Sequence, residues 1–148
     1  MVTTVAVDPG CEAMGWAIFH DHELVHCGLA RGKSWYDTAR DLPTVVKHVD
    51  LLVVEHPQHY PKSPVDPNTL IKLGFNLGAA AVHFRPVKIV TPTPREWKGQ
   101  TPKDIHNARV LRKLNDLERE RFRGVTIVSL QHNVLDAIGL GLWSLGRL

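Results

Sequence analysis

Three acidic residues occur where the sequence predicts the ends of secondary-structure elements. Asp8 follows an apolar, β-branched run at 2–7, Glu55 ends the apolar run at 50–55, and Asp136 lies in the first turn of a final apolar helix. If the two strands are parallel neighbours, both carboxylates emerge at one sheet edge, where ligand sites of open α/β sheets gather. Converging carboxylates repel one another unless a cation lies between them, and such oxygen ligands select Mg²⁺ or Mn²⁺. Ions held in this way can activate water and stabilise the leaving oxygen of a phosphodiester.

Each acid also has an ordinary structural interpretation. Asp8 precedes Pro9-Gly10 and could be a turn residue. An acid at the end of an apolar strand is common, and Asn133 with Asp136 forms a usual helix start. Taken singly, each residue favours the ordinary interpretation. The three together, in this order and at these positions, favour a functional site.

The hydrophobic pattern predicts an α/β fold. We expect strands at 2–7, 14–19, 23–29, 50–55, 87–90 and 125–130, and helices at 34–49, 68–84, 103–122 and 133–145. Pro43 should end or kink the first helix, and a proline-rich loop is expected at 91–102. Three antiparallel opening strands followed by parallel strands and helices suit an RNase H-like fold, with a mixed five-stranded sheet flanked by helices. The length of 148 residues fits a single domain over 1–148.

Composition narrows the class of protein. The formal charge of +3 is mildly basic and compatible with nucleic acid as a partner. Cys11 and Cys27 have no paired metal-ligand spacing, so we expect reduced thiols in a cytoplasmic protein. Apolar stretches are short, and the first residues lack a signal pattern, so no membrane partner is expected.

Three stretches of the chain resemble motifs of the RuvC Holliday-junction resolvases. They are VAVDPGCEAMGWAIF, with its Asp-Pro-Gly turn, VVEHPQHYPKSPVDPNTLIKLGFNLGAAA, with a strand ending in Glu, and HNVLDAIGLGLW. They occur in the order of the family motifs, and the resemblance extends over nearly the whole chain. The short, phage-borne members are the nearest comparison.

The resemblance implies a structure-specific endonuclease that cuts four-way (Holliday) DNA junctions symmetrically as a homodimer. Asp8, Glu55 and Asp136 would bind a pair of Mg²⁺ ions, for which Mn²⁺ could substitute. Two symmetric cuts require two sites, which a C₂ dimer supplies. The helix at 68–84, with its small residues, corresponds to the family's dimer region; close packing on the sheet within one subunit is the alternative. The family also implies a location inside the cell, which for a phage-encoded member is the bacterial host.

The fourth active-site residue departs from the family pattern. Where the family carries an acid, or in some members a histidine, this chain has Asn133, three residues before Asp136. His132 lies four residues before Asp136, and both spacings share a helix face. We favour His132 as a metal ligand and proton carrier, with Asn133 as the alternative.

The resemblance also indicates residues that contact DNA. Family lysines near the scissile phosphate correspond to Lys98 and Lys103, and Tyr60 or His59 could stack on bases where the family has a wedge residue, here Gln58. Trp97 is interpreted as a packing residue. A phosphate-binding stripe could include Arg109, Arg112 and Lys113, although a solvated helix face explains them equally well.

Other functions remain open from the sequence. A related nuclease could cut flaps, replication forks or RNA–DNA hybrids. A catalytically silent protein could bind junctions without cutting them. An actin-like ATP-binding domain is disfavoured because the chain is short and lacks a second phosphate loop.

Overall fold

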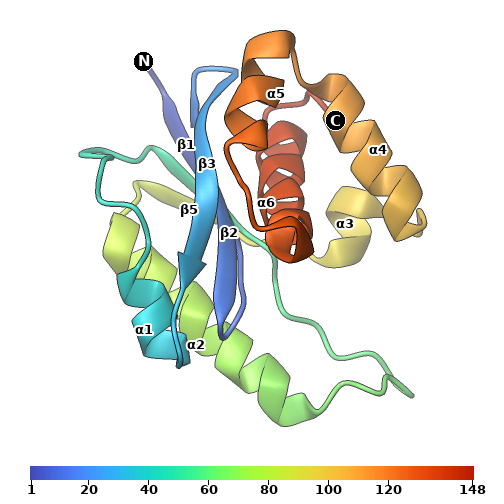
Figure 1. Cartoon of the computed structure of the whole chain (residues 1–148). Coiled ribbons are helices and arrows are strands. Elements are labelled where there is room, and N and C mark those ends of the chain that lie inside the picture. Colours follow the sequence, from blue (N-terminus) through green and yellow to red (C-terminus); the bar gives the residue numbers. More distant parts are fainter.

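Five strands form one mixed sheet in the order β3-β2-β1-β4-β5 (Figure 1). The protein is described over residues 1–148 by a computed structural model. β1 (Thr3–Asp8) pairs antiparallel with β2 (Ala13–His20), and β2 pairs antiparallel with β3 (Glu23–Arg31). β4 (Leu51–Val54) and β5 (Lys88–Val90) continue the sheet in the parallel sense. The predicted RNase H-like sheet, three antiparallel strands followed by parallel ones, is confirmed.

Both faces of the central strands are buried, which explains their continuous apolar sequences. Val5 and Val7 face one hydrophobic cluster, whereas Ala6, between them, faces another that also contains Val53. All four residues are fully buried. Successive side chains of a strand point to opposite faces, so a strand covered on both sides is mainly apolar, with Thr3 and Thr4 as the buried polar residues of β1.

Helices cover the two faces in separate groups (Figure 1). α1 (Trp35–Arg40) and α2 (Pro67–Phe84) lie on one side of the sheet. The opposite side carries α6 (Gln131–Ser144), whose apolar residues pack on β1 and β2. No single helix is long and apolar enough to cross a membrane; Asp116–Arg123 and Val128–Ser144 pass that test only together, as a pair bent by 119°.

The first predicted helix, 34–49, is much shorter than expected. Ser34 is its N-cap, with its side chain accepting a hydrogen bond from the Asp37 amide, but the helix ends at Arg40. Pro43 cannot continue a helix because its ring clashes with the preceding turn. Leu42 and Val49 lie outside the helix but are buried in the core. Their apolar character therefore reflects core packing and does not indicate a helix.

The predicted helix at 103–122 is broken into two. α4 (Lys103–Lys113) ends before Leu114, and α5 (Asp116–Arg123) starts anew. Asn115 and Glu118 form a capping box at the break, each side chain accepting a hydrogen bond from the other's backbone amide. A capping box satisfies amides that a new helix start leaves unpaired, so the Asn-x-x-Glu spacing was the signal for this boundary.

Two further predictions are wrong in detail. Residues 125–130 form no strand: Val125 is buried, and a 3₁₀ turn, η1 (Val128–Leu130), follows it. The loop predicted at 91–102 contains a short helix, α3 (Pro94–Lys98), capped by Thr93. Pro94 occupies the first turn, where proline lacks only an amide that would be unpaired anyway.

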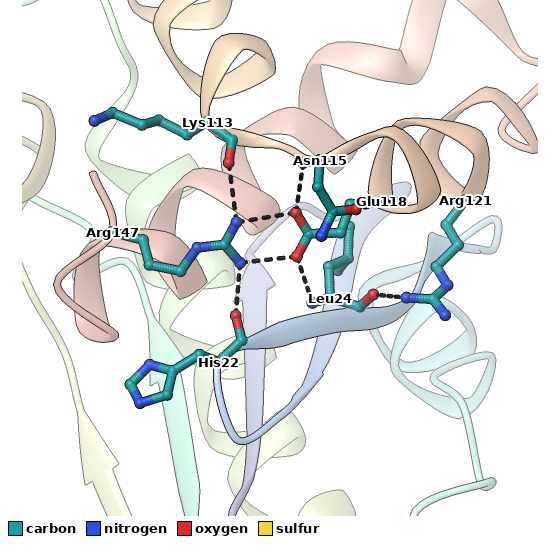
Figure 2. Close-up of polar contacts among 7 residues, drawn as sticks. All are labelled: His22, Leu24, Lys113, Asn115, Glu118, Arg121 and Arg147. Atoms are coloured by element: carbon teal, nitrogen blue, oxygen red, sulfur yellow. Dashed lines mark hydrogen bonds and ion pairs between the residues drawn. The ribbon is translucent and has the colours of Figure 1, made fainter.

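A buried carboxylate ties the end of the chain to α5 and β3 (Figure 2). Glu118 accepts hydrogen bonds from both terminal nitrogens of Arg147, at 2.8 and 2.9 Å, and from the amides of Leu24 and Asn115, each at 2.9 Å. Its side chain is 1% exposed. A bidentate arginine is the strongest partner available to a buried carboxylate.

The same arginine joins two other segments to this carboxylate. Arg147 donates to the carbonyl oxygens of His22, at 2.6 Å, and Lys113, at 2.9 Å. It therefore connects the β2–β3 turn with the last residue of α4. Burial raises the pKa of Glu118, but the hydrogen bonds from Arg147, Leu24 and Asn115 outweigh it, so the pKa lies below its ordinary value of 4.5.

We predict that Glu118→Gln lowers the free energy of unfolding at neutral pH by about 3–5 kcal/mol, because it leaves the Arg147 guanidinium without its buried partner. Since the folded-state pKa is depressed, the carboxylate stabilises the fold above pH 4.5 and this contribution is lost as the pH falls through the folded value. Denaturant unfolding at several pH values measures both effects.

The matched control is Glu120→Gln on the same helix, because the Glu120 side chain is 64% exposed and pairs only with Arg123. Its unfolding free energy should stay close to that of the wild type. Equal stability of Glu118→Gln and the wild type at neutral pH would contradict the role given to this carboxylate.

Candidate active site

Asp8 and Glu55 leave the sheet at the same edge. β1 and β4 are parallel, and their register pairs Val7 with Val54. Asp8 is the last residue of β1, and Glu55 directly follows β4. Two residues that follow a paired position in parallel strands lie side by side, so the register alone brings the two acids together.

The amino end of α6 reaches this edge because Gly15 has no side chain. Gly15 is the cross-strand partner of Asp8. A Cβ atom at Gly15 would lie 1.9 Å from the carbonyl oxygen of Asn133, far inside van der Waals contact. The first turn of α6 therefore rests directly on β2 beside Asp8, and Asp136 follows one turn later.

The charges of this region act on one another. Burial raises the pKa of Asp8 well above its ordinary value, and the negative charges of Asp136 and Glu55 raise it further. Lys98 and Lys103 lower it. The structure thus brings the three predicted acids and the two predicted lysines within electrostatic reach of one another.

Glu55 is held by two neighbours from α3. Its Oε2 atom accepts a hydrogen bond of 2.6 Å from the indole Nε1 of Trp97 and lies 3.6 Å from Nζ of Lys98. The side chains of Glu55 and Lys98 are 19% and 30% exposed, respectively, so this ion pair is partly shielded from solvent. Trp97 is buried, in line with its predicted packing role, and it also donates a hydrogen bond to Glu55, which the sequence did not indicate.

A small polar cavity lies between α3, α4 and α6. It has a volume of about 120 Å³ and is lined by Lys98, Thr101, Lys103, His106 and Asp136, none of them hydrophobic. α4 begins here without a side-chain cap, because its N-cap residue is Pro102. Two lysines and the positive end of a helix make the cavity attractive to an anion, opposite the carboxylate of Asp136.

The acid cluster is not a ready-made metal site. No group of three His, Cys, Asp or Glu side chains is arranged so that it could hold a metal ion. The donor chemistry nevertheless fits a hard cation: burial first, and then the negative charges of Asp136 and Glu55, raise the pKa of Asp8 despite the two nearby lysines. Carboxylate oxygens are the ligands that Mg²⁺ and Mn²⁺ take.

His132 and Asn133 both lie in the first turn of α6, which starts at Gln131 rather than at Asn133. Asn133 is therefore not an N-cap residue, and Asp136 belongs to the second turn. Both candidate side chains are half-buried. They stay three and four residues before Asp136 on one helix, so the choice between them remains open.

The other predicted DNA-binding residues are spread more widely. Arg109, Arg112 and Lys113 are exposed on α4, and the last two lie roughly 14 Å along the helix from its first residue, at 1.5 Å per residue. Tyr60 borders a groove of about 340 Å³ with Pro94, Arg95, Gly99 and Gln100. His59 is exposed in the same loop.

Two polar residues anchor the turn that follows Asp8, and the sequence analysis did not identify them. The buried Asn76 of α2 donates through its side-chain amide to the carbonyl of Gly10, and Thr38 of α1 donates to the carbonyl of Cys11 at 2.8 Å. Asn76 interrupts the apolar and small residues of α2, and this interruption was the only local sequence feature that could have identified it.

His106 was not identified from the sequence either, and no local sequence feature marks it as a neighbour of the site.

Solved structures share this fold, although no family model and no curated protein matches the sequence. The chain is similar to Thermus thermophilus RuvC in complex with a Holliday junction substrate, with a TM-score of 0.65 and 16% identity over 97% of this chain and 92% of that one. It is also similar to the fowlpox virus Holliday junction resolvase, with a TM-score of 0.62 and 17% identity over 99% and 100% of the two chains. At these identities the likeness establishes the fold, which is that of the RuvC-like resolvases.

Proposed function

We propose that this protein is a metal-dependent endonuclease that resolves four-way DNA junctions. The observation that carries the proposal is that Asp8 and Glu55 leave the sheet at one edge, where Asp136, Lys98 and Lys103 lie close enough to influence the pKa of Asp8. The fold supports it, because the similar structures are a RuvC bound to a Holliday junction and a viral Holliday junction resolvase.

In this proposal the three carboxylates hold Mg²⁺, whose bound form supplies the Lewis acidity that activates water and stabilises a departing phosphodiester oxygen. The crowding of negative charge at Asp8 supports this role, since a cation relieves it. Lys98 and Lys103 line the polar cavity next to Asp136. They contact the phosphate and offset the charge that develops on it during cleavage.

His132 is the proposed fourth member of the site. It precedes Asp136 by one helical turn, and α6 is fixed on the sheet at this turn by the contact with Gly15. An imidazole can accept the proton of the attacking water, which the Asn133 amide cannot. This chemical difference is the reason for favouring His132.

The proposed active form is a homodimer, since one chain carries one site and a junction needs two symmetric cuts. An apolar groove of about 540 Å³ between α1 and α2 supports it, with Trp35, Tyr36 and Phe75 among its lining residues. Gly74 and Gly78 of α2 border open space, where an added Cβ would meet nothing within 4 Å. These two glycines therefore do not pack on the sheet, whereas Ala80 of the same helix is fully buried against it.

The acid site predicts three inactive variants. Asp8→Asn, Glu55→Gln and Asp136→Asn should each lower the rate of nicking a synthetic four-way junction with Mg²⁺ by at least about 100-fold, because each loses a charged ligand of a metal that contributes several kcal/mol. Circular dichroism confirms that each variant is folded. Normal cutting by all three would show that the site is wrongly assigned.

Glu12→Gln is the matched control, an exposed acid on the loop after Asp8 that should leave nicking unchanged. Flap, fork and RNA–DNA hybrid substrates are compared in the same assay. Faster cutting of any of them than of the junction would assign the protein to another nuclease activity. Mg²⁺-independent junction binding without nicking would identify a silent binding protein.

The fourth residue is decided by separate alanine substitutions. We expect His132→Ala to lower the nicking rate at saturating Mg²⁺ by about 10²–10⁴-fold, the usual contribution of a general base, and Asn133→Ala to lower it much less. Single-turnover rates on the junction measure both. The opposite ranking would transfer the role to Asn133.

The dimer is tested by Phe75→Glu. Phe75 is 48% exposed on α2, and a charge in an apolar interface is not solvated, so the variant should sediment as a monomer where the wild type sediments as a dimer. Val128→Glu is the control, because Val128 is 77% exposed outside the groove. A wild type that is monomeric both free and on junction DNA would rule the dimer out.

A further inference from the structure

Trp97 is a buried tryptophan whose only polar atom, the indole nitrogen, is hydrogen-bonded to an acid of the site. Its ring is 4% exposed, and its indole N–H donates to Glu55 Oε2 at 2.6 Å. A buried indole N–H requires an acceptor, and a carboxylate is the strongest one. The bond leaves Oε1 of Glu55 without any hydrogen bond inside the chain, so that oxygen is available to a ligand.

The ring of Trp97 is fixed from three sides. A Cβ atom at Gly139 of α6 would lie 2.8 Å from the ring, so the helix backbone is in close contact with it. The ring of His106 meets it edge-on, with 5.0 Å between centroids, and Lys98 Nζ lies 4.9 Å from its centroid. An indole held in this way fixes the direction of its N–H, and with it the position of Glu55.

His106 is buried but chemically unpaired. It is 2% exposed, and neither ring nitrogen has a hydrogen-bond partner. If the residue served packing alone, an apolar ring would do so without the cost of burying two unpaired polar atoms. It lines the polar cavity together with Asp136, and burial, the largest influence, lowers its pKa although Asp136 raises it. A neutral imidazole offers one donor and one acceptor.

We propose that Trp97 and His106 are a pair of positioning residues for the acid site: the indole N–H of Trp97 orients Glu55, and the unpaired ring nitrogens of His106 are available to Asp136 in the polar cavity that both residues line. The proposal rests on the metal-binding role given above to these two acids. Both positioning residues come from the segment that follows β5, whereas the acids they serve come from β4 and α6. The pair therefore joins two ligands that no local structure connects.

The direct test is Trp97→Phe, which keeps one aromatic ring but removes the N–H and the bulk of the second ring, so it also loosens the packing against Gly139. We expect Mn²⁺ to bind the DNA-free protein about 10–100-fold more weakly, the usual effect of losing a partner that orients a ligand. Electron paramagnetic resonance of free Mn²⁺ measures the affinity. Trp143→Phe is the matched control, since Trp143 packs on the same hydrophobic cluster but borders Asp50 and Leu51 at the other end of β4.

A spectroscopic readout separates positioning from stability. The indole N–H resonance missing from the spectrum of ¹⁵N-labelled Trp97→Phe belongs to Trp97, and in the wild type we expect Mg²⁺ to shift it while the Trp143 resonance stays in place. Wild-type Mn²⁺ affinity of Trp97→Phe together with an unmoved Trp97 resonance would overturn the role of Trp97.

His106 is tested by two replacements. His106→Phe keeps an aromatic edge against Trp97 and removes both nitrogens, and we expect Mn²⁺ affinity to fall about tenfold or more. His106→Gln restores a donor and an acceptor, and we expect it to recover part of the loss. If His106→Phe binds Mn²⁺ as tightly as the wild type, its nitrogens have no role and the pair reduces to Trp97.

These measurements use no DNA, so they can fail or succeed independently of the proposed function. Weak Mn²⁺ binding by Trp97→Phe in a protein whose wild type cuts no junction supports the pair and rejects the resolvase. Normal junction cutting and wild-type Mn²⁺ affinity in both Trp97→Phe and His106→Phe reject the pair and leave the resolvase standing.

Discussion

The close approach of α6 to the sheet is the constraint on which the rest of the site depends. Gly15 on β2 admits the backbone at Asn133, and Gly141 on α6 admits the ring of Phe19, which would lie 2.1 Å from an added Cβ. A side chain at either position would push the helix outward. With the helix in this position, Asp136 lies near enough to Asp8 to raise its pKa, and Gly139 packs against Trp97. The packing of α6 on the sheet therefore fixes the position of Asp136. It also fixes Trp97, the residue that orients Glu55.

Two carboxylates, the buried Glu118 and the half-buried Asp8, show how neighbouring groups set the pKa of a shielded charge. At Glu118, hydrogen bonds from Arg147 and two backbone amides outweigh burial, and the pKa falls. At Asp8, burial and two neighbouring acids act in the same direction, and the pKa rises well above its ordinary value. The hydrogen bonds around Glu118 compensate for its burial, so its charge stabilises the fold. The arrangement at Asp8 opposes folding, and strongly perturbed carboxyls in such surroundings are typical of functional sites.

The sheet separates two kinds of surface. Toward α3, α4 and α6 it presents acids, lysines and a small polar cavity. Toward α1 and α2 it presents an open apolar groove. Chemistry and self-association, if both occur as proposed, would take place on different faces of one sheet, so the association would not obstruct access to the acids.

The sequence by itself indicated the two central strands and the acids that end them, because residues 5–7 and 51–54 are continuously apolar, as is typical of strands covered on both faces. Element boundaries were less accessible. The helix end at Arg40 and the break at Leu114 depend on a proline clash and a capping box that compete with continuing apolar periodicity. Only the tertiary structure revealed Trp97 and His106 as neighbours of the acids. Trp97 bonds to a residue 42 positions away, and His106 shares a cavity with Asp136, 30 positions away. Side chains that meet across such distances leave no periodic pattern, since their positions follow from how close helices pack on a sheet.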